Sequence, residues 1–383
     1  MANVDYTQMN KDASAACINR GKNVVQKIAT FTNTSNPYVA GQATVINLPL
    51  VNVGLIKRLW VRCVANVAQT VAETHTAQNL GPANFLSQIV VTDLNNLVRV
   101  NTTGWHLSML STARRQLAFG ASFTSDSPFG FGSNYGLVKI PASLTAAANM
   151  SVFYEIPLSY SDADLRGAMF ANVTTASMNL QLTINPNLFQ TLTGDPVLSC
   201  FKSSTATLGK INTYTIDVYQ EYIDQLPRYQ DGSYQLPMID IATQYNVLNS
   251  NATGLAVGAD FSLPYAALRS YLSTFVIYDN AGVLNAGTDI NYFALQSANS
   301  MNLFKYDAFV AQLLNGRIKI NDDWPIGLYY FDHRAQPIST IAGGNTQLIV
   351  NPSSVGANSI LQLGYEFFSN TQQLQQAGSI TSQ

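Results

Sequence analysis

Apolar and polar residues alternate over short stretches along most of the chain, and this two-residue period is typical of half-buried β-strands. The pattern is densest in Tyr271–Tyr292. Tyr271–Tyr278 contains the aromatic and β-branched residues that strands favour, and Asp279–Gly282 contains the residues of a tight turn. A second turn cluster, Asn285–Asp289, follows before Ile290–Tyr292. We interpret this stretch as β-framework, because it contains no histidine and no cysteine.

The first half of the chain repeats this pattern. Asp93–Asn96 lies between two apolar runs and predicts a hairpin turn. Gly120–Ala148 is rich in glycine, alanine and serine, so we expect an extended surface loop there. A helix is expected at Ser161–Met169, because its first residue can cap it and Asp162 and Asp164 suit the dipole of a first turn. The strands predicted in this half are Ala43–Leu50, Leu55–Ala65, Phe85–Thr92, Leu97–Asn101, Ser151–Leu158, Met178–Ile184 and Ile211–Ile223.

A domain boundary is expected at Asp224–Pro237, where two prolines bracket the turn Tyr229–Gly232. Proline cannot serve in a central strand, so strand order must break there. Beyond it a helix is expected at Tyr306–Leu314, closed by Gly316. The polar tail Thr371–Gln383 is expected to be an arm. The strands predicted in this second half are Asp260–Leu263, Ser270–Asp279, Ile290–Leu295, Gly327–Asp332, Thr346–Val350 and Ile360–Ser369.

The two halves echo each other. Leu48-Pro49 opens the first β-run and Leu263-Pro264 opens the second, and each run ends in an aromatic strand that carries a glutamate. A chain of 383 residues exceeds what one hydrophobic core usually supports. The absence of βαβ alternation predicts an all-β fold of two sandwiches, of Greek-key or jelly-roll type, with a few short helices. The expected division is an N-terminal arm at 1–40, a first sandwich at 41–232, a second at 233–370 and a C-terminal arm at 371–383.

The first 30 residues differ from the rest. Apolar residues recur there at near-helical spacing, and four cations against Asp5 and Asp12 give a net charge of +2. This predicts a short amphipathic helix, interrupted at Gly21, whose basic face could rest on an anionic membrane surface. A terminal arm that orders only on assembly is the alternative, and the sequence leaves both open. The four cations are Lys11, Arg20, Lys22 and Lys27.

Composition points to a neutral, polar surface. Charged residues make up 11% of the chain, against about 25% in typical soluble domains. Such a surface suits close packing against many neighbours, since little charge repulsion opposes it. The net charge of −2 and the pI near 5.9 argue against direct binding of nucleic acid, sequence-specific or not, which needs clustered lysine and arginine.

The cysteine pattern and the lengths of the apolar runs argue against a disulfide-bonded, a metal-binding and an integral membrane protein. Cys17, Cys63 and Cys200 are odd in number and far apart, so we expect buried free thiols rather than disulfides or a metal motif. No apolar run approaches the roughly 20 residues that cross a bilayer, and no signal-peptide pattern is seen at the N-terminus. Synthesis in the cytoplasm, without integration into a membrane, is the expectation.

The histidines offer one imaginable catalytic group. Asp332-His333-Arg334 could form a triad with Ser339, but no G-x-S-x-G elbow accompanies it, and such a tripeptide at a strand end more often makes a turn. His106, beside Trp105, is expected to hydrogen-bond within a packed aromatic cluster. His75 is expected in a polar loop.

Paired carboxylates are the other candidates. A glycosidase needs two carboxylates about 5–9.5 Å apart, whereas adjacent residues on a strand, such as Asp322 and Asp323, point to opposite faces. Asp162 and Asp164 already have a role at the expected helix start. Gly130–Gly132 is too short for a phosphate loop. The sequence therefore predicts no catalytic, cofactor-binding or metal-binding residue, and no enzyme.

A series of motifs then carries a specific resemblance. In the order of the chain, the motifs are Gly81–Asn84, Gly104–Leu107, Asp126–Pro128, Asp164–Ala168, Ala171–Val173, Asp224–Pro227, Tyr271–Thr274, Asn285–Tyr292, Val350–Pro352 and Gly364–Glu366. With these the chain resembles the major capsid protein of tectiviruses, tailless double-stranded DNA phages with an internal membrane.

The resemblance implies a double jelly roll with strands perpendicular to the capsid surface. It implies a homotrimer of pseudo-hexagonal outline that tiles an icosahedral shell around the membrane. Expected partners are neighbouring trimers, vertex and minor capsid proteins, and the internal membrane, which the N-terminal arm would contact. The expected location is the virion, after synthesis in the host cytoplasm.

Two other classes compete with this expectation. The first is a carbohydrate- or receptor-binding β-sandwich of a virion, in which Phe129, Phe131 and Tyr135 could stack on sugars. The second is a glycoside hydrolase that uses Asp322 and Asp323.

Overall fold

The computed structural model describes most of the chain. It covers residues 5–69, 75–78, 80–114, 140–141, 143–172, 176–191, 198–203, 209–284, 288–297, 302–318, 327–340 and 346–370. Most of the expected loop Gly120–Ala148, the tail Thr371–Gln383 and part of the turn Asn285–Asp289 lie outside these residues.

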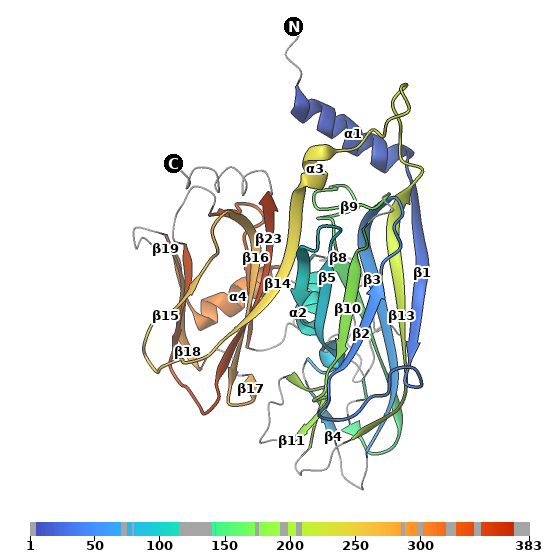
Figure 1. The fold of residues 1–383 in the computed structure, drawn as a ribbon. Helices are drawn as coiled ribbons and strands as arrows, with labels where there is room; N and C mark the ends of the chain where they lie inside the picture. The colour runs from blue at the N-terminus through green and yellow to red at the C-terminus, as the bar shows by residue number, and fades with distance from the viewer. Residues whose placement is uncertain are drawn as a thin grey trace.

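The first sandwich consists of two facing sheets, on the right in Figure 1. The outer sheet has the order β1-β13-β3-β8, and its facing sheet has the order β6-β5-β10-β2. The short β9 (Met169–Phe170) also pairs with β3. Bounds in the outer sheet are β1 Lys22–Thr32, β13 Lys210–Asp224, β3 Leu55–Ala68 and β8 Ala148–Pro157, and in the facing sheet β6 Val98–Thr102, β5 Leu86–Thr92, β10 Asn179–Ile184 and β2 Thr44–Pro49.

The second sandwich, on the left in Figure 1, repeats this order. Its sheets run β14-β23-β16-β20 and β15-β22-β18-β19, with β17 (Val283–Leu284) and β21 (Ile338–Ser339) also paired to β16. Bounds are β14 Thr243–Ala252, β23 Ile360–Asn370, β16 Arg269–Asn280 and β20 Leu328–Asp332, and β15 Phe261–Pro264, β22 Gln347–Pro352, β18 Ile290–Gln296 and β19 Asn302–Asp307. The weak echo between the halves of the sequence is thus a repeat of strand order.

One sheet joins the two sandwiches. β14 pairs with β6 in parallel, through Val247 opposite Val100 and Leu248 opposite Asn101. This produces one ten-stranded sheet in which half of each sandwich takes part. A smaller sheet at the lower end of the first sandwich contains β11 (Phe189–Thr191), β12 (Phe201–Ser203), β4 (His75–Ala77) and β7 (Ser143–Leu144).

The helices lie at the ends and sides of the sandwiches. α1 (Tyr6–Arg20) begins at Asp5, whose carboxylate accepts from the backbone N–H of Thr7 and Gln8, and ends before Gly21 as expected. It crosses the upper end of the first sandwich beside α3 (Met238–Ala242) in Figure 1. α2 (Gly104–Arg114) follows β6, and α4 (Ala308–Ile318) follows β19. The remaining short helix is a 3₁₀ turn, η1 (Pro82–Phe85).

The prediction of a helix at Ser161–Met169 is wrong. The segment forms a tight turn in which the N–H of Tyr160 donates to the carbonyl of Arg166. Gly167 has φ of +93°, a left-handed conformation that a helix cannot contain, and a Cβ there would lie 2.3 Å from that of Tyr245. Asp162 and Asp164, instead of starting a helix, form ion pairs with arginine side chains.

The hydrophobic core does not stop at the boundary between the sandwiches. One cluster contains the inner residues of the first sandwich together with Tyr245, Phe275, Leu328 and Tyr330 of the second. A second cluster fills the space between the two sheets of the second sandwich. The sheet that contains β16 and β23 is therefore buried on both faces.

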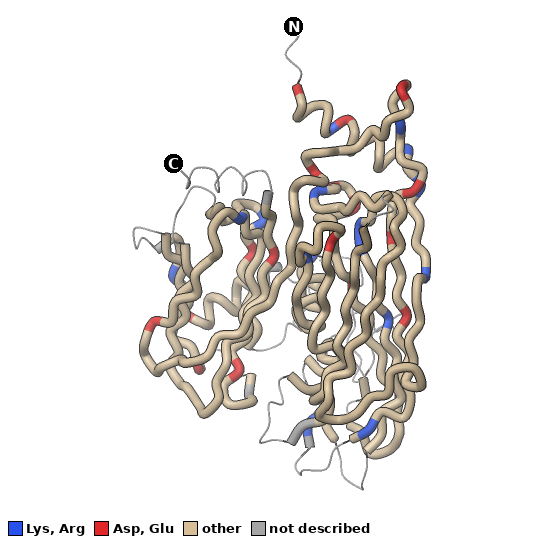
Figure 2. Tube along the Cα trace, viewed as in Figure 1, with Lys and Arg blue, Asp and Glu red and all other residues tan. Residues whose placement is uncertain are grey.

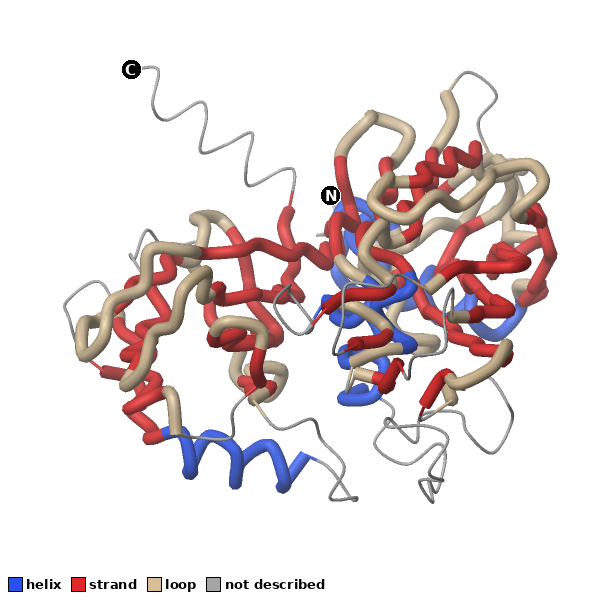
Figure 3. The backbone as a smooth tube through the Cα atoms, turned by 90° about the horizontal axis from the view of Figure 1, so that it is seen from below, coloured by secondary structure: helices blue, strands red, loops and turns tan. Residues whose placement is uncertain are grey.

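The expected N-terminal arm, residues 1–40, contains α1 and β1. β1 pairs with β13 from Lys22 opposite Asp224 to Thr32 opposite Thr215. In the view from below, the described parts of both sandwiches form two blocks side by side (Figure 3).

Candidate functional site

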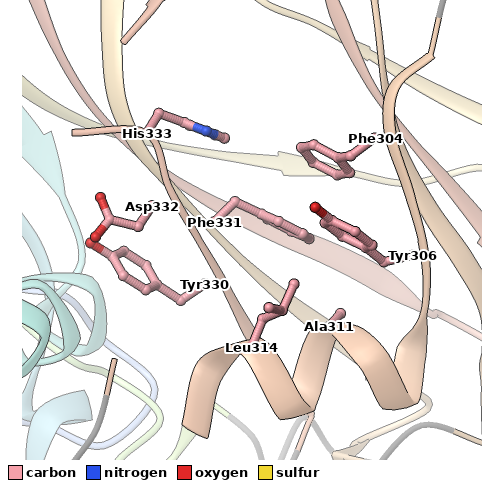
Figure 4. Close-up of a pocket in the computed structure, with 8 residues that line it drawn as sticks. All are labelled: Phe304, Tyr306, Ala311, Leu314, Tyr330, Phe331, Asp332 and His333. Carbon is pink, nitrogen blue, oxygen red and sulfur yellow. The ribbon is translucent and has the colours of Figure 1, made fainter. Parts of the chain in front are cut away.

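The pocket at the expected triad lies between β19, α4 and β20 and has a volume of about 280 Å³. Its wall is largely aromatic (Figure 4). The lining residues are Phe304, Tyr306, Ala311, Leu314, Tyr330, Phe331, Asp332 and His333.

Asp332 and His333 do not form a catalytic pair. The Asp332 carboxylate accepts from Nε and Nη2 of Arg334 at 2.9 and 2.6 Å. Burial alone would raise the pKa of Asp332, but these bonds from Arg334 lower it. Burial lowers the pKa of His333 to about 4, and in Figure 4 its ring points away from the Asp332 carboxylate. Ser339 does not line the pocket. The tripeptide makes a turn, in which the N–H of Arg334 donates to Asp332.

His106 hydrogen-bonds within a packed aromatic cluster, as expected. It is completely buried, its Nδ1 lies 2.7 Å from the hydroxyl of Thr102, and its ring meets that of Phe275 edge-on. Burial lowers its pKa to about 3. The imidazole is therefore neutral and belongs to the contact between the two sandwiches. His75, expected in a polar loop, is instead buried in β4 against Phe189, because a small sheet closes over it.

The candidate carboxylates serve ion pairs. Asp162 contacts Lys57 and Arg58 from above the first sandwich's outer sheet, and Asp164 accepts bidentately from Arg166. Asp322 and Asp323 lie outside the described residues, as do Gly130–Gly132 and the three aromatics proposed to stack on sugars.

The three cysteines are free and buried, as expected. Burial raises the pKa of Cys17 to about 11 and those of Cys63 and Cys200 well above the usual value, so the thiols are protonated and poorly reactive. Across the described residues, no cluster of three or more metal-ligating side chains exists. In the same part of the chain, no helix has both the length and the apolar character needed to span a bilayer.

The four basic residues expected at a membrane divide between two elements. Lys11 and Arg20 lie on α1, and Lys22 and Lys27 lie on β1. Lys27 forms an ion pair of 2.6 Å with Asp217 on the outer sheet. Charged residues gather at the α1 end of the first sandwich (Figure 2).

A buried polar group lies between the sandwiches, and the sequence did not reveal it. Arg114, at the end of α2, forms an ion pair with Glu366 of β23 and donates to the hydroxyl of Tyr245 at 2.6 Å. Ser273 donates to the other Glu366 oxygen at 2.7 Å. Burial opposes the charge of Arg114, but Glu366 raises its pKa above the usual value. In the sequence, the glutamate inside the aromatic strand Tyr365–Phe367 is the feature that could have indicated this polar group.

Chemically, these surfaces hold protein together rather than transform a substrate. The buried charges of Arg99, Arg114 and Glu366 are paired, His106 and His333 are neutral, and the thiols are protonated. The arrangement suits a structural protein.

Comparison with known proteins gives matches along nearly the whole chain. The family described as P3 major capsid protein N-terminal matches residues 10–226, and the P3 major capsid protein C-terminal family matches 242–382. The major capsid protein P3 of Enterobacteria phage PRD1 is 35% identical over 380 residues, which cover 97% of this chain and 94% of the relative.

Solved capsid structures share the fold. The atomic structure of Sulfolobus Turreted Icosahedral Virus contains a chain with a TM-score of 0.63 and 13% identity, covering 91% of both chains. A chain of the PBCV-1 virus capsid has a TM-score of 0.52 and 10% identity, covering 91% of this chain and 94% of its own. These likenesses confirm the expected fold, two jelly rolls in one chain.

Proposed function

The chain belongs to the P3 major capsid protein family, and we propose from this that three copies close into a pseudo-hexagonal homotrimer that tiles the viral shell. The protein is a structural component of a phage capsid and is located in the virion. Its family is structural rather than enzymatic. The observation that carries the proposal is the family match over both jelly rolls.

The repeat of strand order supports the pseudo-hexagonal outline of the proposed trimer. Each chain contributes two blocks of the same topology, so three chains contribute six. The expected domain division, with jelly rolls at 41–232 and 233–370 and arms at 1–40 and 371–383, remains our proposal except at the N-terminus, where β1 (Lys22–Thr32) is a strand of the first sandwich and not part of an arm. It is supported by the segment between Asp224 and Met238, in which the isolated bridge Arg228–Tyr234 connects two stretches of loop.

Light scattering on the purified protein tests the trimer. We expect a mass of about 125 kDa, three times the chain mass of 41.6 kDa. A monomer whose mass does not change with concentration would contradict the proposal.

The N-terminal arm is our proposed contact with an internal membrane. Lys11 and Arg20 are exposed on α1, as are the apolar side chains of Tyr6, Met9 and Ile18, and this mixture suits the surface of an anionic bilayer. Lys22 continues the basic region onto β1, and Lys27, the fourth cation of the expected contact, is paired with Asp217. Neighbouring trimers and vertex or minor capsid proteins complete the proposed set of partners.

Removal of residues 1–28 tests the membrane contact. The deletion also removes part of β1, so a second variant, Lys11→Gln with Arg20→Gln, changes charge alone. We expect the charge variant to remain trimeric by light scattering but to bind vesicles with anionic lipid less than wild type in a flotation assay. Equal binding would contradict the contact.

A further inference from the structure

The pocket between β19, α4 and β20 is a space in the second sandwich that its side chains leave unfilled. β19 belongs to one sheet of this sandwich and β20 to the other, and α4 contacts both strands. The interiors of folded proteins contain few voids larger than a water molecule, whereas this pocket measures about 280 Å³. An apolar cavity of about 150 Å³ is large enough to bind benzene. The pocket therefore has room for a molecule with two rings.

Three rings with nearly parallel planes form part of the pocket wall. Phe304 and Tyr306 lie on the same face of β19, and their rings stack with centroids 4.7 Å apart and planes 8° apart. The ring of Phe331 on β20 stacks with that of Phe304 at 5.5 Å and 16°. Aromatic rings pack well in stacked and edge-on arrangements. This wall therefore suits a flat aromatic ligand.

His333 supplies a polar atom to the pocket. The residue is only 9% exposed, and its Nε2 is buried without a hydrogen-bond partner among the residues that the structure describes. In Figure 4 the ring extends from β20 toward Phe304, across the pocket. A buried polar atom without a partner costs free energy, and that cost is recovered when a ligand supplies the partner.

The protonation of His333 decides which chemical group the ligand needs. Burial lowers the pKa of His333 to about 4, so its imidazole is neutral near pH 7. In a neutral imidazole one nitrogen donates and the other accepts, and a hydroxyl can pair with Nε2 in either tautomer. The carboxylate of Asp332 is already bound by Arg334, so the lining favours an uncharged ligand.

We propose that this pocket binds an uncharged aromatic alcohol with two fused rings, whose rings lie against Phe304 and Phe331 and whose hydroxyl forms a hydrogen bond with Nε2 of His333. All the lining residues belong to one chain, so the site does not depend on the proposed trimer. The ligand contacts β19 and β20, which belong to different sheets. Its binding therefore stabilises the second sandwich against separation of those sheets.

Isothermal titration calorimetry of the full chain with 2-naphthol tests the site. We expect one ligand per chain and a Kd below about 1 mM, which is within reach of a ligand of this size in a fitting pocket. We also expect 2-naphthol to raise the Tm of the protein, because it binds the folded state. An absence of binding up to about 1 mM would overturn the proposal.

Two variants of His333 test the hydrogen bond. His333→Phe keeps a flat ring but leaves the hydroxyl without a partner, so the affinity for 2-naphthol should fall about tenfold. The side-chain amide of His333→Gln both donates and accepts, so this variant should retain most of the affinity. Equal affinities of His333→Phe and wild type would show that His333 does not bind the hydroxyl.

A larger side chain on α4 tests the location of the ligand. Leu314 lines the pocket, and Leu314→Trp should fill it and abolish binding. Leu313→Trp is the matched control, because Leu313 is 54% exposed and does not line the pocket, and its affinity should equal that of wild type. Circular dichroism checks that both variants fold.

The outcomes remain decisive for each variant. Binding that persists in a folded Leu314→Trp chain places the ligand elsewhere and overturns the site. If Leu314→Trp does not fold, the comparison of His333→Phe with His333→Gln still decides. The mass of the wild type in light scattering is a separate measurement, so failure of the pocket leaves the proposed trimer standing.

Discussion

Gly364 of β23 shows at the scale of one residue how closely the two sandwiches fit. A Cβ added there would lie 2.4 Å from Cδ2 and 2.5 Å from Nε2 of His106, which is on α2 of the other sandwich. The ring cannot easily move, because it also contacts Thr102 and Phe275. The absence of a side chain at residue 364 therefore makes room for the imidazole.

Gly364→Ala should destabilise the protein by about 1–3 kcal/mol, the usual cost of overpacking a filled core. The free energy of unfolding in urea, compared with wild type, measures this loss. His106→Ala made in the same chain frees the space, so the double variant should lose less than the sum of the two single losses. Strict additivity would show that the two residues do not compete for the same volume.

At the scale of elements, the ion pair of Arg114 and Glu366 ties α2 to β23. The carboxylate of Glu366 is fully buried and also accepts a hydrogen bond from the hydroxyl of Ser273. A buried charge that loses its partner keeps the whole cost of its desolvation. The pair therefore matters to the docking of the helix more than a surface pair would.

Glu366→Gln should cost about 3–5 kcal/mol, because it leaves the arginine charge without its counter-ion. Arg114→Met added to that variant should recover part of the loss, since no unpaired charge then remains. Urea unfolding of the two single variants and the double variant provides the cycle. If Glu366→Gln unfolds like wild type, the pair does not stabilise the docking of α2.

The alternating pattern predicted most strands well and failed for elements whose structure depends on tertiary contacts. β3, β13, β16 and β23 lie close to their expected ranges, because each alternates or is continuously apolar. α2 was missed, since Trp105, His106 and Leu107 are buried on all sides of the helix and leave no amphipathic signal. β14 was missed because its many polar residues, such as Asn246 and Asn249, hide the period that defines it.

Of the candidate site, the sequence predicted one local turn and little more. Sequence alone indicated that Asp332-His333-Arg334 makes a turn, and the contacts of Asp332 with Arg334 confirm it. The partnership of Arg114 with Glu366 spans 252 residues and follows from topology, which no local pattern encodes.

At the scale of the whole molecule, the shared sheet and the shared core make the two sandwiches one cooperative unit. β14 and β6 belong to different sandwiches but to the same sheet. Tyr245 and Phe275 of the second sandwich belong to the core cluster of the first. Neither half can lose its structure without exposing apolar surface of the other.

Thermal unfolding followed by calorimetry should therefore show one transition, with the heat capacity change of the whole chain. The oligomer mass before heating must be measured in the same buffer, since dissociation adds its own heat. Two resolved transitions, each with roughly half the enthalpy, would indicate that the sandwiches unfold separately.

The end strands β1 and β19 also bear on solubility before assembly. A strand at the end of a sheet presents backbone N–H and C=O groups on which any foreign strand can add, and lysine side chains hinder such an approach. In a chain with only 11% charged residues, Lys22 and Lys27 lie on β1 and Lys305 lies on β19. These three lysines therefore hinder the addition of a foreign strand to the two end strands before assembly.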